Sequence, residues 1–206
     1  MDNLFVNNRV EIGGEIVSGF RYSHEICGEK FYLFDLKVDR LSDSFDIVPV
    51  MISERLINVK ENLIGSFLNV SGQFRSFNRK DGEKTHLVLS VFARAVEFIE
   101  ENNNTNSAFF EGYVCKPTSY RKTPLGREIA DVLIAVNRPY GKSDYIPCVF
   151  WGRNAKFASG FYIGEHIKVW GRVQSREYQK RISEIESETR TAYELSINKV
   201  EVVKGV

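Results

Sequence analysis

Apolar and polar residues alternate along much of this chain, and this pattern predicts β-strands. In the segment FYLFDLKVDR, for example, Tyr32, Phe34, Leu36 and Val38 fall on one face of a strand by period two. Similar runs, separated by turn-forming residues, occur throughout the chain. The predicted strands span residues 9–20, 31–40, 46–53, 66–77 and 85–99, and then 109–116, 128–138, 144–152, 166–178 and 192–203.

Two segments break this alternation and favour short helices. Residues 54–65 (ERLINVKENLIG) place Gly65 where a helix C-terminal cap is expected, and a similar stretch follows at 153–163. The polar stretches 20–30 and 117–127 are predicted to be loops. The glycine pair Gly13 and Gly14 predicts a bulge or tight bend in the first strand.

The two halves of the chain repeat one another. Asp46, Pro49 and Arg55 correspond to Asp144, Pro147 and Arg153 at a constant separation of 98 residues. LKVDR ending at Arg40 and IAVNR ending at Arg138, and also Gly14 and Gly112, keep that separation, whereas Gly72 and Gly171 are 99 apart. Repetition at this spacing indicates two copies of one domain.

The polar segment EENNNTN at 100–106 separates the copies and is predicted to be a linker. We therefore expect an N-terminal domain at 1–103 and a C-terminal domain at 107–206. Five strands with a short helix between the third and fourth describe an OB fold, a small Greek-key barrel. The predicted fold class is all-β, with two such five-stranded barrels in tandem.

Composition and charge limit the classes of protein to which this chain can belong. No apolar run is long enough for a membrane helix and no signal peptide is evident, so a soluble cytoplasmic protein is expected. Cys27, Cys115 and Cys148 lack the spacing of a zinc site, and we expect no metal, no cofactor and no disulfide frame. Residues 1–106 hold 12 Lys and Arg against 16 Asp and Glu, whereas residues 107–206 hold 16 against 11. A polyanion is therefore expected to approach the second half.

Catalytic motifs are missing from the sequence. His24, His86 and His166 are scattered, and there is no nucleophile elbow, no HExxH and no phosphate-binding glycine loop. The carboxylates cluster only in ISEIESE, which reads as a solvated hairpin. We therefore predict that the protein is not an enzyme.

The second copy resembles the DNA-binding domain of bacterial single-stranded DNA-binding proteins. The resemblance rests on RKTPLGREIADVLIAVNR, DYIPCVFWG followed by Ala155, IGEHIKVWGRVQSREY, and a closing strand with VEVV. It covers about residues 109–203, while the first copy joins the family only through the repeat. The resemblance implies binding of single-stranded DNA without sequence preference, in replication, recombination or repair.

In that family, bases stack on aromatic rings while Lys and Arg contact the phosphates, and such stacking tolerates any base. The family's stacking positions fall here on Tyr140, Tyr145, Trp151 and Tyr178. Trp170, between Val169 and Gly171, is instead expected to pack on the barrel or at a subunit contact. The expected phosphate contacts are basic residues interleaved with the rings. They are Arg121, Lys122, Arg127, Arg138, Arg153, Arg172, Arg176, Lys180 and Arg181.

The same four positions in the first copy hold no ring. They fall on Ser42, Ile47, Ser53 and Arg79. We therefore expect the first domain to bind DNA weakly or not at all by this route and to serve assembly or extension of the surface, although Phe45, Phe77 and Arg79 could offer a shifted contact.

Family members usually assemble four OB folds, so the resemblance implies a homodimer. Many also end in an acidic tail that recruits other proteins, whereas this sequence stops at KVEVVKGV, and we expect no such tail. Two alternatives stay open at this point. The chain could be a tandem OB protein-interaction or accessory module of a replication assembly, or it could bind single-stranded RNA.

Overall fold

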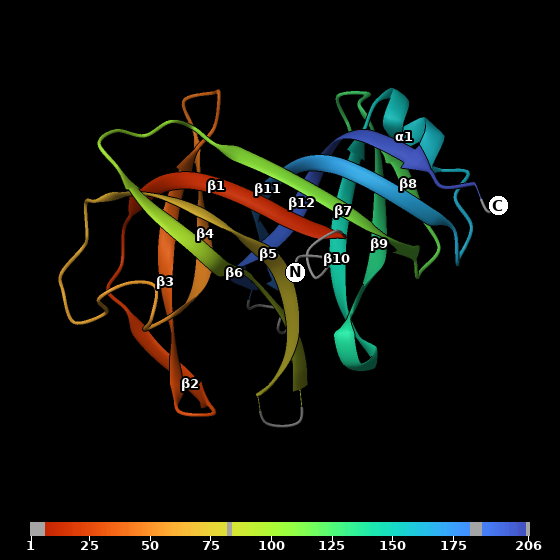
Figure 1. The fold of residues 1–206 in the computed structure, drawn as a ribbon. Coiled ribbons are helices and arrows are strands. Elements are labelled where there is room, and N and C mark those ends of the chain that lie inside the picture. Colours follow the sequence, from red (N-terminus) through yellow and green to blue (C-terminus); the bar gives the residue numbers. More distant parts are fainter. Residues whose placement is uncertain (1–6, 82–83, 182–186, 205–206) are drawn as a thin grey trace.

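The protein consists of two closed β-barrels (Figure 1). A computed structural model describes residues 7–81, 84–181 and 187–204, without the side chains of 78–81, 84–86 and 180–181. In the first barrel the neighbours run β3-β4-β6-β5-β1 and return to β3; in the second they run β9-β10-β12-β11-β7 and return to β9. The predicted tandem OB folds are therefore confirmed. The first barrel comprises β1 (Asn8–Ile16), β3 (Glu29–Asp39), β4 (Phe45–Ser53), β5 (Phe67–Asp81) and β6 (Lys84–Ile99); the second comprises β7 (Asn106–Val114), β9 (Glu128–Arg138), β10 (Lys142–Trp151), β11 (His166–Arg181) and β12 (Ser187–Val202).

The two barrels share one continuous sheet because β1 pairs antiparallel with β7. Val10 lies opposite Ala108, and Asn8 lies opposite Phe110. Since residues 10 and 108 are equivalent in the repeat, the pairing is centred on a pseudo-two-fold axis. Segment 100–105 joins β6 to β7, and it is held on the first barrel by hydrogen bonds from the Asn102 side chain to Asp39 (2.8 Å) and from Gly13 N to Thr105 O (2.7 Å).

Two asparagines support the strands where they part from their neighbours. The backbone pairing of β1 with β5 ends at Val10 opposite Gly72. Beyond it, Asn8 Nδ2 donates to Phe74 O (2.9 Å) and Phe74 N donates to Asn8 Oδ1 (3.0 Å), so the buried side chain replaces the next rung. Asn106 makes the same pair of bonds with Val173 in the second barrel (2.8 and 2.9 Å).

Glycines allow each barrel to close. A Cβ on Gly14 would overlap the carbonyl oxygen of Lys37 in β3, and a Cβ on Gly112 would overlap that of Ala135 in β9. Gly14 lies where β1 turns to pair with β3, and Gly112 lies where β7 turns to pair with β9. The repeated glycine is thus required by close backbone approach. β1 keeps an unbroken register with β5 through Gly13 and Gly14, so it has no bulge there.

The prediction that residues 20–30 and 117–127 form loops was partly wrong, because each range contains an additional strand. β2 (Arg21–Ile26) and β8 (Ser119–Lys122) pair with β3 and β9. Cys27 and Gly28, both with positive φ (52° and 76°), form the two-residue turn of the first hairpin, as a primed turn requires. Neither added strand has a buried residue, so neither shows the apolar alternation that would have revealed it.

The predicted helix at 54–65 was also wrong. Residues 54–66 form a series of turns, in which Asn58 Oδ1 accepts from Lys60 N (3.2 Å) and Asn62 Oδ1 accepts from Ile64 N (3.4 Å). Asparagine side chains compete in this way with helical hydrogen bonds. The second barrel does have a helix here, α1 (Arg153–Ala158), where Ala155 and Ala158 are fully buried, but it ends before the predicted Ile163.

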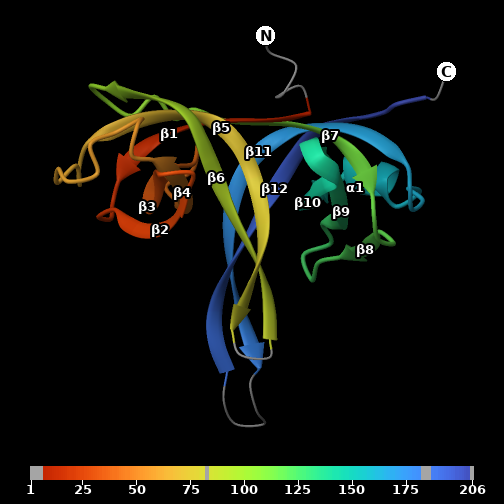
Figure 2. The same ribbon diagram turned by 60° about the horizontal axis from the view of Figure 1, so that its bottom comes forward.

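The core fills both barrels with apolar side chains, including the fully buried Phe34 and Phe74 in the first and Phe110 and Phe150 in the second. Cys27, Cys115 and Cys148 are all unpaired. No helix within the described ranges has the length and apolar character needed to cross a membrane. Outside the barrels, the β5–β6 and β11–β12 hairpins project as two arms from the same side of the molecule (Figure 2).

Candidate nucleic-acid interface

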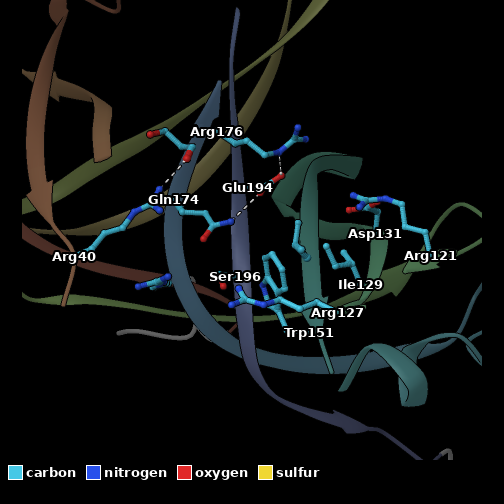
Figure 3. Close-up of a pocket in the computed structure, with 13 residues that line it drawn as sticks. Arg40, Arg121, Arg127, Ile129, Asp131, Trp151, Gln174, Arg176, Glu194 and Ser196 are labelled. Atoms are coloured by element: carbon cyan, nitrogen blue, oxygen red, sulfur yellow. Dashed lines mark hydrogen bonds and ion pairs between the residues drawn. The ribbon is translucent and has the colours of Figure 1, made fainter. Parts of the chain in front are cut away.

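Trp151 lies in a basic groove on the second barrel. Its side chain is at the end of β10, opposite Ile129 of β9, and is 40% exposed. The groove has a volume of about 620 Å³, and Figure 3 shows its lining. Five arginines line it together with two carboxylates: Arg40, Arg121, Arg127, Arg172 and Arg176, with Asp131 and Glu194. The groove therefore combines an accessible ring with a net positive charge.

Some of these arginines are already paired. Arg121 Nη2 lies 3.0 Å from Asp131 Oδ2, and Arg176 Nε lies 3.6 Å from Glu194 Oε2. Glu194 is buried and also accepts from Gln174 Nε2 (2.8 Å). In contrast, none of the carboxylates that the structure describes pairs with Arg127 or Arg172. These two guanidinium groups are the most available to an incoming phosphate.

Tyr145 lies on the same outer face of β10 as Trp151, six residues earlier, and is 44% exposed. It lines a separate cavity of about 250 Å³ together with Phe77 of the first barrel and Arg138. A third cavity, of about 320 Å³, lies between them, because it shares Val149 with the Trp151 groove and reaches Pro147. The outer face of β10 is therefore concave over most of its length.

Tyr140 and Tyr178 are exposed but lie outside the Trp151 groove. Tyr140, 99% exposed, is in the short 3-10 turn η1 (Pro139–Gly141). Tyr178 is on the projecting part of β11, with the guanidinium carbon of Arg176 6.0 Å from its ring. The structure thus brings one predicted ring into the basic groove and distributes the other three around it. Trp170 packs against Phe109 (5.1 Å between centroids) and under Lys199 (4.3 Å).

The predicted phosphate contacts divide in the same way. Arg121, Arg127, Arg172 and Arg176 line the groove, while Arg138 lines the cavity at Tyr145. Lys122 pairs with Glu128 at 3.9 Å, and Arg153 lies outside the groove at the start of α1. The side chains of Lys180 and Arg181 lie outside those described.

The sequence interpretation missed Arg40, which belongs to the first barrel but lines the groove of the second. Its Nε and Nη2 donate to Asp46 (2.8 and 2.5 Å), and Nη2 also donates to Ser175 O of β11 (3.0 Å). The signal that could have found Arg40 is the repeat, since Arg40 corresponds to the predicted Arg138.

Two buried aspartates hold the barrels together. Asp46 Oδ1 accepts from Ser175 N (2.6 Å) and Ser175 Oγ (2.9 Å) across the junction, and Asp144 Oδ1 accepts from Ser76 N (2.8 Å) in the opposite direction. Burial alone would raise the pKa of Asp46, but the bonds from Arg40 and Ser175 outweigh it and lower the pKa below its ordinary value.

Asp144 behaves differently from its counterpart. Its Oδ2 lies 3.4 Å from Arg138 Nε, but neither of these buried atoms has a hydrogen-bond partner among the described residues. Burial therefore dominates and raises the pKa of Asp144. The two halves of the junction have the same topology but unequal strength.

Comparisons with known proteins agree with this architecture. Residues 105–203 match the model of the single-strand binding protein family. Single-stranded DNA-binding protein 3 of Listeria innocua is 35% identical over 81 residues, which cover 36% of this chain and 51% of that protein. Single-stranded DNA-binding protein B of Bacillus subtilis is 30% identical over 81 residues, covering 36% of this chain and 72% of that protein. The chain thus spans about half the length of the first of these relatives.

The whole chain also resembles a solved structure. The wild-type single-stranded DNA binding protein from Thermus aquaticus aligns with a TM-score of 0.76 at 19% identity, covering 97% of this chain and 94% of that one. At this identity the likeness establishes the fold, including the presence of both barrels. The family match over residues 105–203 and the Bacillus subtilis relative, covered to 72%, establish the family: this chain belongs to the single-strand binding protein family.

Proposed function

We propose that the protein binds single-stranded DNA without sequence preference and protects it during replication, recombination or repair. The observation that carries the proposal is the exposed ring of Trp151 in a groove lined by Arg127 and Arg172. An aromatic face takes any base, at about 1–3 kcal/mol per stacked base, and the arginines add a salt-dependent attraction to phosphate. The groove acts by binding alone, in the cytoplasm, and we assign it no catalytic step.

The groove is best suited to a strand whose bases are unpaired. A base must leave its partner to lie flat on an indole ring, which a duplex resists because unstacking costs a few kcal/mol. Tyr145, on the same face of β10, extends the surface available to a single strand. The remaining predicted rings, Tyr140 and Tyr178, are proposed as outer contacts for longer strands.

For the assembly, we propose two domains per chain, 1–103 and 107–206, and two chains per particle. The shared sheet presents a row of side chains in which Arg9 covers Phe109, Phe109 packs on Trp170, and Lys199 covers Trp170. This partly apolar surface offers a place for a second copy. Sedimentation should then give twice the chain mass of 23.7 kDa.

Fluorescence anisotropy with labelled oligonucleotides tests the binding proposal. We expect similar affinities for oligo-dT and mixed single strands, and weaker binding to the corresponding duplex. Competition with oligo-U separates a DNA binder from an RNA binder. Equal binding to duplex and single strand would overturn the stacking proposal, and absence of binding at low salt would favour the protein-interaction alternative.

A further inference from the structure

The first barrel has a groove of its own at the position equivalent to the Trp151 groove. It has a volume of about 370 Å³ and includes Phe31, Arg75 and Phe92. Through the repeat, Phe31 and Arg75 correspond to Ile129 and Gln174, which line the groove of the second barrel. The exchange of arginines is also reciprocal, since Arg138 of the second barrel lines this groove as Arg40 lines the other.

The aromatic ring of this groove comes from a different strand than the ring of the Trp151 groove. In the second barrel Trp151 of β10 lies directly opposite Ile129 of β9. In the first barrel Ser53 occupies the tryptophan position, but Phe31 lies directly opposite it on β3. Residues directly opposite in a sheet share one face. The ring missing from position 53 is therefore supplied on the same face by its cross-strand neighbour, but Phe31 is buried (9% exposed) where Trp151 is 40% exposed, so it can only back the groups that lie over it.

A second ring and two guanidinium groups extend this surface. The ring of Phe92 lies 5.6 Å from that of Phe31, and His24 stacks on Phe31 at 5.1 Å with an angle of 12° between the planes. The guanidinium carbons of Arg75 and Arg94 lie 4.1 and 4.8 Å from the Phe92 centroid. Planar guanidinium and imidazole groups backed by aromatic rings are surfaces on which nucleobases stack.

The charge of the groove suits a nucleic acid. Among the residues that the structure describes, no carboxylate lines this groove, unlike the Trp151 groove, which includes Asp131 and Glu194. Burial, and then the neighbouring Arg94 and Arg138, lower the pKa of Arg75 to about 10. A phosphate beside Arg75 would relieve this accumulation of positive charge.

The groove is also continuous with the candidate site on the second barrel. The cavity that contains Tyr145 shares Ser76, Phe77 and Arg138 with the groove of the first barrel. Phe77 is 40% exposed at this crossing. A strand that leaves Trp151 along the outer face of β10 passes Tyr145 and then meets Phe77.

We propose that the first barrel carries a second base-stacking site for single-stranded DNA, in which His24, Arg75 and Arg94 stack on bases with the support of Phe31 and Phe92. The strand enters it from the second barrel between Tyr145 and Phe77. This inference rests on the proposed function, since it extends the path of the same ligand.

The test uses the full chain and dT oligomers from about 8 to about 40 nucleotides, because one OB fold occludes roughly 4–16. Phe92→Leu keeps an apolar side chain but removes the ring, and Arg75→Gln removes the charge. Both should weaken binding of the long oligomers about tenfold and leave the short ones unchanged. Phe98→Leu is the control, since it makes the same substitution at an exposed phenylalanine of β6 outside the groove, whereas Phe92 is half-buried.

Long oligomers whose distal half is abasic separate phosphate contacts from base stacking, because that half keeps its phosphates but has no bases. These should bind the wild-type chain about as weakly as full dT oligomers bind Phe92→Leu. If Phe92→Leu and Arg75→Gln bind long dT as tightly as wild type, or if abasic tracts restore full affinity, the second site is refuted. Trp151→Ala distinguishes this failure from failure of the proposed function, because it should weaken short and long oligomers alike.

Discussion

Asp46 of the first barrel accepts two hydrogen bonds from Ser175 of the second, one from the backbone nitrogen at 2.6 Å and one from the hydroxyl at 2.9 Å. The carboxylate is fully buried and also holds Arg40 at the edge of the Trp151 groove. The relation between the barrels is therefore fixed by a charged group, not by the linker alone.

Replacing Asp46 with Asn should reduce the free energy of unfolding at neutral pH by about 2 kcal/mol, because Arg40 loses a charge-assisted partner. The equivalent Asp144→Asn should cost much less, since Asp144 Oδ2 makes no hydrogen bond in the described chain. Urea unfolding of both variants checks this. Equal losses for the two would contradict the unequal strength of the junction.

The pH dependence of stability should also differ between these variants. The pKa of Asp46 is lower in the folded chain than the value of about 3.9 in an unfolded one, so its stabilisation is complete above that value and is lost as the pH falls through the folded pKa. Asp144 has a raised folded pKa, so its burial destabilises the fold above that pKa, and this penalty disappears as the pH falls. Unfolding free energies of Asp46→Asn should therefore fall less steeply with acid than those of wild type. A steeper fall would mean that folding raises the pKa of Asp46 and does not lower it.

Asn8→Ala should destabilise the first barrel by about 2–3 kcal/mol. The substitution leaves the backbone N–H and C=O of the fully buried Phe74 without partners, and each buried unsatisfied group costs about 1–3 kcal/mol. Asn106→Ala should have a comparable effect through Val173. Thermal unfolding measures both, with the exposed Asn62→Ala as control. Wild-type stability of Asn8→Ala would show that the strands re-pair without the side chain.

Salt dependence should identify the arginines that contact phosphate. Arg172→Gln should reduce the slope of log K against log salt by about 0.7, the value expected for one lost contact with a single strand. Arg153→Gln, which removes the same charge outside the groove, should leave the slope nearly unchanged. Titrations with oligo-dT at several salt concentrations measure it. Equal slopes for the two variants would place the phosphates elsewhere.

Much of the fold could be predicted from the sequence, because alternation and the repeat are local and periodic signals. The two barrels follow from them. The exposed position of Trp151 was expected from the family resemblance instead, and the glycine pair predicted a bulge or bend but not the close approach of Gly14 to the Lys37 carbonyl oxygen. The extra strands β2 and β8 were missed because their residues are exposed on both faces, so no apolar period marks them.

Other features depend on contacts between barrels or between strands, which spacing alone does not reveal. Arg40 reaches the second groove only because Asp46 and Ser175 meet across the junction. Transferring ring positions one by one finds Ser53 and overlooks Phe31, since the ring moved to a neighbouring strand and not along its own. Only the strand pairing of the folded chain shows that Phe31 supplies a ring to the groove of the first barrel.

The proposed function depends on single strands stacking on Trp151, and tryptophan fluorescence can follow this stacking because the chain has only two tryptophans. Trp170→Phe leaves Trp151 as the sole reporter, and Trp151→Phe leaves Trp170, which is packed under Lys199. Titration with oligo-dT at low salt should strongly quench the first variant, scarcely change the second, and give weaker binding at high salt. Quenching of Trp170 with an unaltered Trp151 signal would show that single strands do not stack on Trp151.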